Sequence, residues 1–165
     1  MRYKAMWIFL FFLVIGGLVV TPSFARNPMM DGGMMGGNGM GTIHQLFANH
    51  QQIHRTVQDI PGGIRATTES DNPKVTALIQ SHVPSMYQRM NKKQVIPMVQ
   101  MAPSLSPLIR NAGSYQRQFQ LTSKGIAVTE TSQDPKITAV IREHAREVSK
   151  FVTEGMPAMM KQRTR

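Results

Sequence analysis

An internal repeat constrains the fold of this chain more than any other feature. Residues 63–90, GIRATTESDNPKVTALIQSHVPSMYQRM, align without a gap to residues 125–152, GIAVTETSQDPKITAVIREHAREVSKFV, at an offset of 62. Ten of the 28 aligned positions are identical, and the same offset pairs Arg55 with Arg117. One such unit alone cannot bury its apolar side well, so we expect two similar halves that pack into one core.

Each half contains the signals for a short helix, a β-hairpin and a long helix. In the first half, Pro61-Gly62-Gly63 separates two extended runs and predicts a hairpin. Asn72-Pro73 and Asp134-Pro135 combine a capping side chain with proline at the first helical position, which is the preferred helix start. Pro84 lies inside the first long helix and is expected to kink or end it.

These signals predict an α+β fold. We expect a duplicated α-β-β-α unit, with a four-stranded, mostly antiparallel sheet and the two long helices packed on one face. The predicted organisation is a signal peptide (1–25), a Met/Gly-rich mobile arm (26–41), a single domain of two repeats (42–155, with repeats 42–92 and 104–154 and a connector 93–103), and a Met-rich basic tail (156–165).

The first 25 residues have the pattern of an export signal. Arg2 and Lys4 form a basic start, Met6 to Val20 an apolar run, and Ser23-Phe24-Ala25 a small-x-small cleavage site. We therefore expect an exported protein, periplasmic or secreted, cleaved near Ala25.

Net charge and cysteine content limit which partners and which kinds of metal site this chain can have. Loss of the signal peptide removes two basic residues and no acidic one, which lowers the net charge from +10 to +8. Export argues against nucleic acid as the partner of this charge. The alternatives are an anionic envelope polymer, a lipid surface or an acidic partner, and a basic surface that only keeps the protein soluble explains the charge at least as well. The chain has no cysteine, which excludes thiolate metal sites, iron–sulfur clusters and covalent haem attachment.

Methionine is concentrated where the chain is not expected to pack. Residues 27–41, NPMMDGGMMGGNGMG, hold five methionines and six glycines. Thioethers are soft ligands that suit Cu(I), so this arm is a candidate copper-capturing segment; the alternative is a linker or oxidation-scavenging tail. The connector adds two more methionines. The candidate thioether ligands are Met29, Met30, Met34, Met35, Met40, Met98 and Met101.

Histidine supplies the candidate interior ligands. His82 and His144 occupy equivalent positions near the centre of the apolar stripe of each long helix. His50 lies on the predicted apolar face of the first short helix, and His54 joins that face only if the helix extends through it. A buried imidazole is either satisfied by a hydrogen bond within the core or available to Cu, Zn or a non-covalently held haem.

Catalytic signals are absent from the sequence. The chain has no Gly-x-Ser-x-Gly, P-loop, dinucleotide or HExxH motif. Its nine acidic residues lie mostly at predicted helix starts or on polar faces, where capping and solvation account for them. We therefore expect a non-catalytic protein.

Three stretches carry a family resemblance. At TIHQLFANHQQIHRTV, GGIRATTESDNPKVTALIQSHVPSMYQRM and KGIAVTETSQDPKITAVIREHAREVSKFVTEGMPAMM, the chain resembles a family of small exported bacterial proteins with Met/Gly-rich N-terminal arms. The resemblance spans roughly residues 29–160. It implies export and a single compact domain, and it carries over no catalytic or binding residue.

Together these features predict an exported copper-binding protein that uses the Met-rich arms and interior histidines. The first alternative is a non-covalent haem-binding protein in which His82 and His144 hold the haem. The second is a structural or interaction protein of the envelope with a basic surface and satisfied core histidines.

Overall fold

The computed structural model describes residues 38–94 and 102–162. The predicted signal peptide lies outside these residues, as do Met29, Met30, Met34, Met35, Met98 and Met101. The first helix begins at Asn38, inside the predicted arm (26–41), so the last residues assigned to the arm, including the backbone of Met40, are helical. This helix packs against the first long helix, and such a tertiary contact can override the weak helix propensity of glycine.

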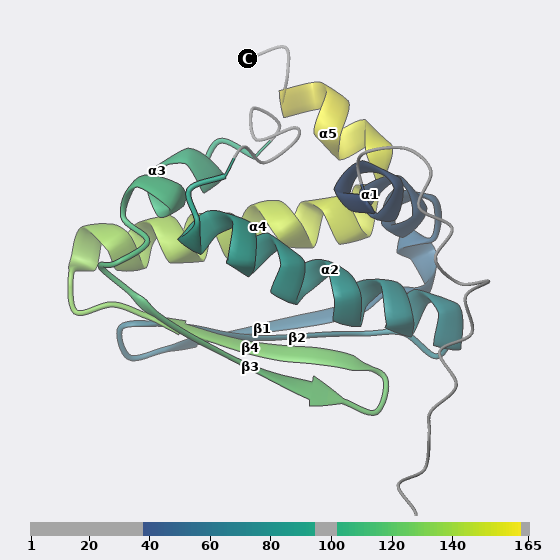
Figure 1. The fold of residues 1–165 in the computed structure, drawn as a ribbon, viewed down its shortest axis with the longest axis horizontal. Helices are drawn as coiled ribbons and strands as arrows, with labels where there is room; N and C mark the ends of the chain where they lie inside the picture. The colour runs from purple at the N-terminus through teal and green to yellow at the C-terminus, as the bar shows by residue number, and fades with distance from the viewer. Residues whose placement is uncertain (1–37, 95–101, 163–165) are drawn as a thin grey trace, which may run out of the picture. The chain divides into compact units, whose positions relative to one another are not determined.

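The described chain is an α+β fold, as the sequence predicts, with a four-stranded antiparallel sheet and helices (Figure 1). Two long helices, α2 and α4, lie on the same side of the sheet. The elements are α1 (Asn38–Ala48), η2 (His50–Gln52), β1 (His54–Ile60), β2 (Gly63–Glu69), α2 (Pro73–Asn91), α3 (Leu105–Arg110), β3 (Gln116–Thr122), β4 (Gly125–Thr131), α4 (Pro135–Glu154) and α5 (Met156–Gln162).

The two hairpins join through their second strands. The strand order is β1-β2-β4-β3, so β2 and β4 form the centre of the sheet. Their register is reciprocal: Gly63 pairs with Thr131, and Gly125, its counterpart in the repeat, pairs with Glu69. This register matches the pseudo-two-fold relation expected from the repeat, whereas the duplication itself stays a prediction from the sequence.

Both long helices begin as predicted. The side chain of Asn72 accepts a hydrogen bond from the backbone N–H of Lys74 at 3.0 Å, and that of Asp134 accepts one from Lys136 at 2.8 Å. Each cap is followed by proline, whose missing N–H needs no partner at a helix start. The α2 helix continues through Pro84 to Asn91, so the proline does not end it.

Each long helix crosses to the other half of the molecule. The α2 helix packs mainly on β4, and α4 mainly on β2. The hydroxyl of Thr76 donates to the Lys124 carbonyl at 3.0 Å, in the turn of the second hairpin, and Thr138 donates to the Gly62 carbonyl at 3.1 Å, in the turn of the first. The threonine that both copies share therefore ties each helix to the opposite hairpin.

The core lies between the helices and the sheet. Ile64, Ile126 and Ile141 are among its fully buried side chains. An edge-to-face contact between Phe47 and Phe151, with ring centroids 5.7 Å apart, links α1 to α4. Among the described residues, no helix combines the length and apolar character needed to cross a bilayer.

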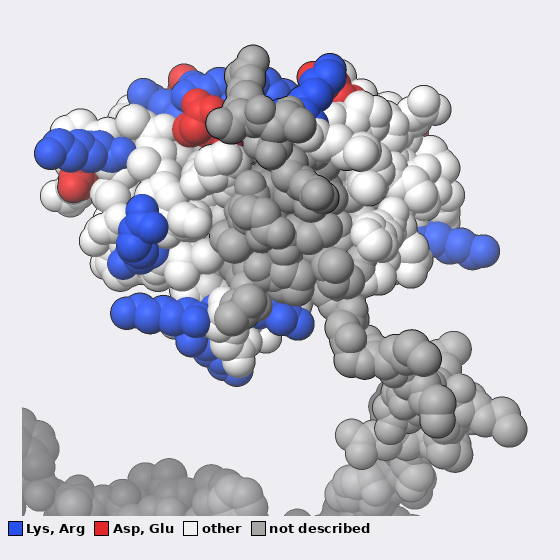
Figure 2. All heavy atoms as spheres, turned by 90° about the horizontal axis from the view of Figure 1, so that it is seen from above, with Lys and Arg blue, Asp and Glu red and all other residues white. Residues whose placement is uncertain are grey.

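The charged surface is discontinuous on the face seen from above. Figure 2 shows lysine and arginine side chains in separate groups, with uncharged surface between them. An extended anionic polymer or lipid surface is bound most strongly by basic side chains that lie together. On this face the described residues offer no such single patch.

Candidate functional site

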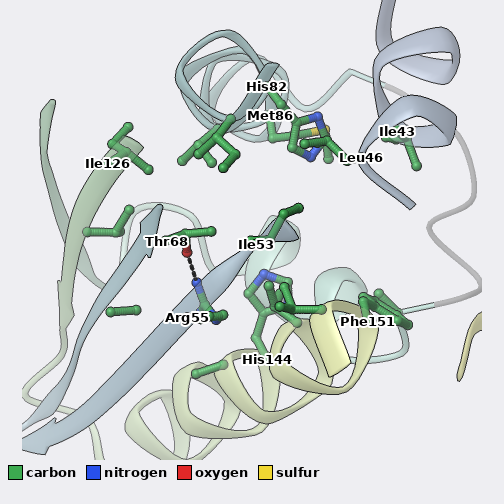
Figure 3. Close-up of a pocket in the computed structure, with 18 of the residues that line it drawn as sticks. Ile43, Leu46, Ile53, Arg55, Thr68, His82, Met86, Ile126, His144 and Phe151 are labelled. Atoms are coloured by element: carbon green, nitrogen blue, oxygen red, sulfur yellow. Dashed lines mark hydrogen bonds between the residues drawn. The ribbon is translucent and has the colours of Figure 1, made fainter. Parts of the chain in front are cut away.

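A cavity of about 240 Å³ lies between α1, α2, α4 and the sheet (Figure 3). Its wall is mostly apolar, with side chains from all of these elements. The polar residues that line it are His50, Arg55, Thr68, His82, Tyr87, Glu130 and His144. An apolar cavity with a few polar side chains is the usual form of a small-molecule or cofactor site.

His82 reaches the cavity from α2 and is half-buried. No hydrogen-bond partner of its ring occurs among residues 38–94 and 102–162. Burial lowers the pKa of His82 to about 4, because a low-dielectric surrounding disfavours the charged ring. The imidazole is therefore neutral at physiological pH, and a neutral ring keeps a nitrogen lone pair available to a metal ion or a hydrogen-bond donor.

Met86 and Met90 follow His82 at one-turn intervals and line the same cavity. Residues four apart on a helix are neighbours on one face, so the His82 ring and the Met86 thioether lie next to each other along the cavity wall. Both methionines belong to the apolar stripe of α2, and neither is among the thioether ligands predicted from the sequence. The His-x3-Met spacing is the signal that could have identified the pair.

His144 enters the cavity from α4, opposite His82 (Figure 3). Its Nδ1 lies 3.0 Å from the Ser104 hydroxyl oxygen, and that hydroxyl donates to the Glu147 carboxylate. Because the hydroxyl hydrogen goes to Glu147, Nδ1–H of His144 is the donor to Ser104, and Nε2 is the ring nitrogen that this contact leaves unused. Burial alone would raise the pKa of Glu147, but hydrogen bonds from His144 and Ser104 outweigh it and lower this pKa. Such outer partners orient metal-binding histidines in known sites.

His50 lines the cavity from η2, and contacts with the C-terminal end of α4 fix the position of its ring. Its Nδ1–H donates to the Val152 carbonyl at 2.9 Å. The ring packs against Gly155, which ends α4 with a φ of 65°, and a Cβ there would come within 2.6 Å of the ring. The glycine thus serves both the left-handed turn and the close approach of His50.

His54 does not line the cavity. The helical segment ends at Gln52, and His54 is the exposed first residue of β1. The condition for His50 and His54 to share a helix face is therefore not met. In the described part of the chain, no three His, Asp or Glu side chains are grouped to hold a metal ion. His50, His82 and His144 share the cavity without forming an all-imidazole cluster.

A buried charged cluster adjoins the cavity, and the sequence analysis missed it. Glu130 is 3% exposed, and its carboxylate lies 3.8 Å from Arg117 Nε. The Arg117 guanidinium lies over the rings of Tyr115 and Tyr87, at 4.3 and 5.0 Å from their centroids. Burial raises the pKa of Glu130. The alternation Ile126, Val128, Glu130 could have placed this carboxylate on the buried face of β4, because strand side chains alternate between faces.

Stability should depend on the ionisation of His82. An imidazole has a pKa of about 6.5 in an unfolded chain, and the folded value is about 4. Below pH 6.5 the unfolded state takes up the proton first, so folding stability falls as the pH drops toward 4. A shift of this size corresponds to about 3 kcal/mol at most, and to less for a half-buried ring that water partly screens.

We expect His82→Leu to lose less stability than the wild type between pH 7 and pH 4.5, as measured by urea denaturation. His54→Gln, which changes an exposed imidazole, should keep the wild-type dependence. An unchanged pH dependence in His82→Leu would contradict the buried, neutral state of His82.

No protein-family model, no curated protein and no solved structure matches the chain. The resemblance to exported bacterial proteins with Met/Gly-rich arms therefore stays a prediction based on the residues quoted for it. Function has to be inferred from the side chains of the cavity.

Proposed function

We propose that the protein is an exported, non-catalytic carrier of a soft metal ion, with Cu(I) as the ion that its ligands suit best. The observation that carries this proposal is His82, a neutral cavity imidazole without a hydrogen-bond partner among the described residues, one helical turn from Met86. Thioether and imidazole are the ligands that Cu(I) prefers when no cysteine is present.

The two ligands on α2 form an incomplete set by themselves. His144 is the best placed candidate for a further ligand, because Ser104 engages its Nδ1, so that Nε2 is the nitrogen that could bind a metal ion. The arm methionines are the second source. In this proposal the arm captures Cu(I) at the surface and passes it to the firmer site formed by His82 and Met86.

Haem is the second candidate, because His82 and His144 project into one cavity from opposite helices. The size of the cavity argues for the smaller ligand. Its volume of about 240 Å³ lies below the range of roughly 300–1,000 Å³ that is usual for drug-sized ligands. A haem would require the helices to separate, whereas a metal ion would not.

The test is Cu(I) titration under reducing conditions against a competing chromophoric chelator. We expect His82→Leu and Met86→Leu each to weaken binding at least about tenfold, or about 1.4 kcal/mol, because each removes one ligand. His54→Gln is the matched histidine control and Met160→Leu the matched methionine control, since both residues are exposed. Both controls should bind as the wild type does.

Two results would overturn the proposal. One is a Cu(I) affinity no tighter than that of a variant in which every methionine is leucine. The other is wild-type affinity in both His82→Leu and Met86→Leu.

A Soret band on haem addition that disappears in His82→Ala or His144→Ala would assign the site to haem instead. Loss of stability with no change in metal content in those alanine variants would favour a structural role for the histidines.

A further inference from the structure

Arg55 is a partly buried cation that forms no ion pair of its own among the described residues. Its side chain lines the cavity, and burial lowers its pKa, although the nearby Tyr87 and Glu130 act in the opposite direction. One terminal nitrogen donates to the Thr68 hydroxyl at 2.6 Å (Figure 3), whereas Nε is buried and has no hydrogen-bond partner in the part of the chain that the structure describes. No carboxylate of the described residues lies within ion-pair distance of it. A buried charge that is left unpaired is costly, so a partner is expected.

The other half of the molecule contains the same arginine with its counterion present. Arg117 is the counterpart of Arg55 at the offset of 62, and it pairs with Glu130. Arg117 and Glu130 are direct cross-strand partners, as are Arg55 and Thr68. Thr68 therefore occupies the position in the first half that Glu130 occupies in the second. The second half supplies its own carboxylate, and the first half offers only a hydroxyl.

Without a carboxylate at position 68, the Arg55 guanidinium lies as a positive charge in a mostly apolar cavity. Arg55, Arg117 and Glu130 together carry one excess positive charge when Glu130 is ionised. Most of the remaining cavity wall is formed by apolar side chains, such as those of Ile53, Ile79 and Val83. An anion that binds there must therefore combine a single negative charge with an apolar body.

We propose that the cavity binds a small monocarboxylic acid, with its carboxylate on the Arg55 guanidinium and its hydrocarbon body along the apolar wall. The planar guanidinium matches a carboxylate in geometry, which favours this anion. A doubly charged phosphate would exceed the one positive charge available. The cavity volume of about 240 Å³ suits an acid with a body of about six to eight carbons, below the size of drug-like ligands.

The test is calorimetric titration of the purified, metal-free protein with octanoate and, separately, with 1-octanol of the same chain length. We expect octanoate to bind at least about tenfold more tightly than octanol, because only the acid neutralises Arg55. Thr68→Glu should weaken octanoate binding at least about tenfold, since it places in the first half the carboxylate that Glu130 provides in the second.

Two further variants keep the test decisive. Thr68→Val removes the hydroxyl but adds no charge, so it should bind octanoate within about twofold of the wild type. Arg55→Met removes the cation while keeping an unbranched side chain, and it should lose the preference for acid over alcohol even if Thr68→Glu fails to fold. Near-ultraviolet circular dichroism checks the fold of each variant.

Equal binding of octanoate and octanol would overturn the proposal, and so would full octanoate binding by Thr68→Glu or Arg55→Met. The absence of any octanoate binding would also overturn it and would leave ordered water as the partner of Arg55. Because the titration uses metal-free protein, its result is independent of copper: either proposal can fail while the other stands.

Discussion

Gly125→Ala is expected to lower the free energy of unfolding by about 4 kcal/mol, at the upper end of what single substitutions cause. A Cβ at Gly125 would lie 2.0 Å from the backbone oxygen of Thr68, and one at Gly63 would lie 1.8 Å from that of Glu130. The obstacle in both places is the backbone of the neighbouring central strand, which cannot rotate away as a side chain can. The alanine therefore has to push β2 and β4 apart where the two halves join.

Urea denaturation at pH 7 measures this effect, with Gly113→Ala as the control. Gly113 has no atom within 4 Å of a built Cβ and no positive φ, so its alanine variant should be within about 0.5 kcal/mol of the wild type. A loss below about 1 kcal/mol in Gly125→Ala would mean that the central strands do not approach as closely as described.

Ile79→Ala and Ile141→Ala, equivalent positions in the repeat, should each lower the free energy of unfolding by about 3 kcal/mol. Ile79 is 2% exposed on α2, and Ile141 is fully buried on α4. Each truncation removes buried methyl and methylene groups and leaves a void, and Ile→Ala changes in cores cost about 2–5 kcal/mol.

The double variant shows how the two halves share the core. Ile79 packs in a cluster with Val75, Ile126 and Val128, whereas Ile141 belongs to the larger cluster that includes Ile64. The two isoleucines belong to separate clusters, although Tyr87 packs against both, so the two losses should add to within about 0.5 kcal/mol. A clearly smaller combined loss would show that the clusters act as one. The exposed Ala139→Gly on α4 is a control for helix propensity, with an expected loss of about 1 kcal/mol.

Local signals predicted the elements well because each depends on a few neighbouring residues. The Pro61-Gly62-Gly63 turn joins β1 to β2, and the Asn72-Pro73 start is the cap of α2, as expected. The first helix was misplaced at its start because the glycines before Thr42 favour coil locally, whereas contact with α2 favours helix there. That contact has no local signature.

The candidate site was predicted only in part. The apolar stripe placed His82 and His144 on inward faces, and both line the cavity. His54 is exposed because the chain turns into β1 two residues after η2 ends. Arg55 and Glu130 were not considered as site residues, because charged side chains in short strands are usually solvated. Whether Arg55 or Arg117 has a carboxylate beside it depends on the residue opposite each arginine on the neighbouring strand. Strand pairing is a tertiary property, so the sequence pattern alone does not show it.

The sequence by itself determined the repeat, the order of the elements, the helix starts and the inward direction of the two shared histidines. All of these follow from backbone preferences and side-chain periodicity, which act over a few residues. Only the tertiary structure decided that β2 pairs with β4, that each long helix crosses to the other hairpin, and that Arg117 has a carboxylate partner while Arg55 has a hydroxyl. These features depend on contacts between residues far apart in the chain. For the two arginines the partner matters because an unpaired charge is costly when it is buried.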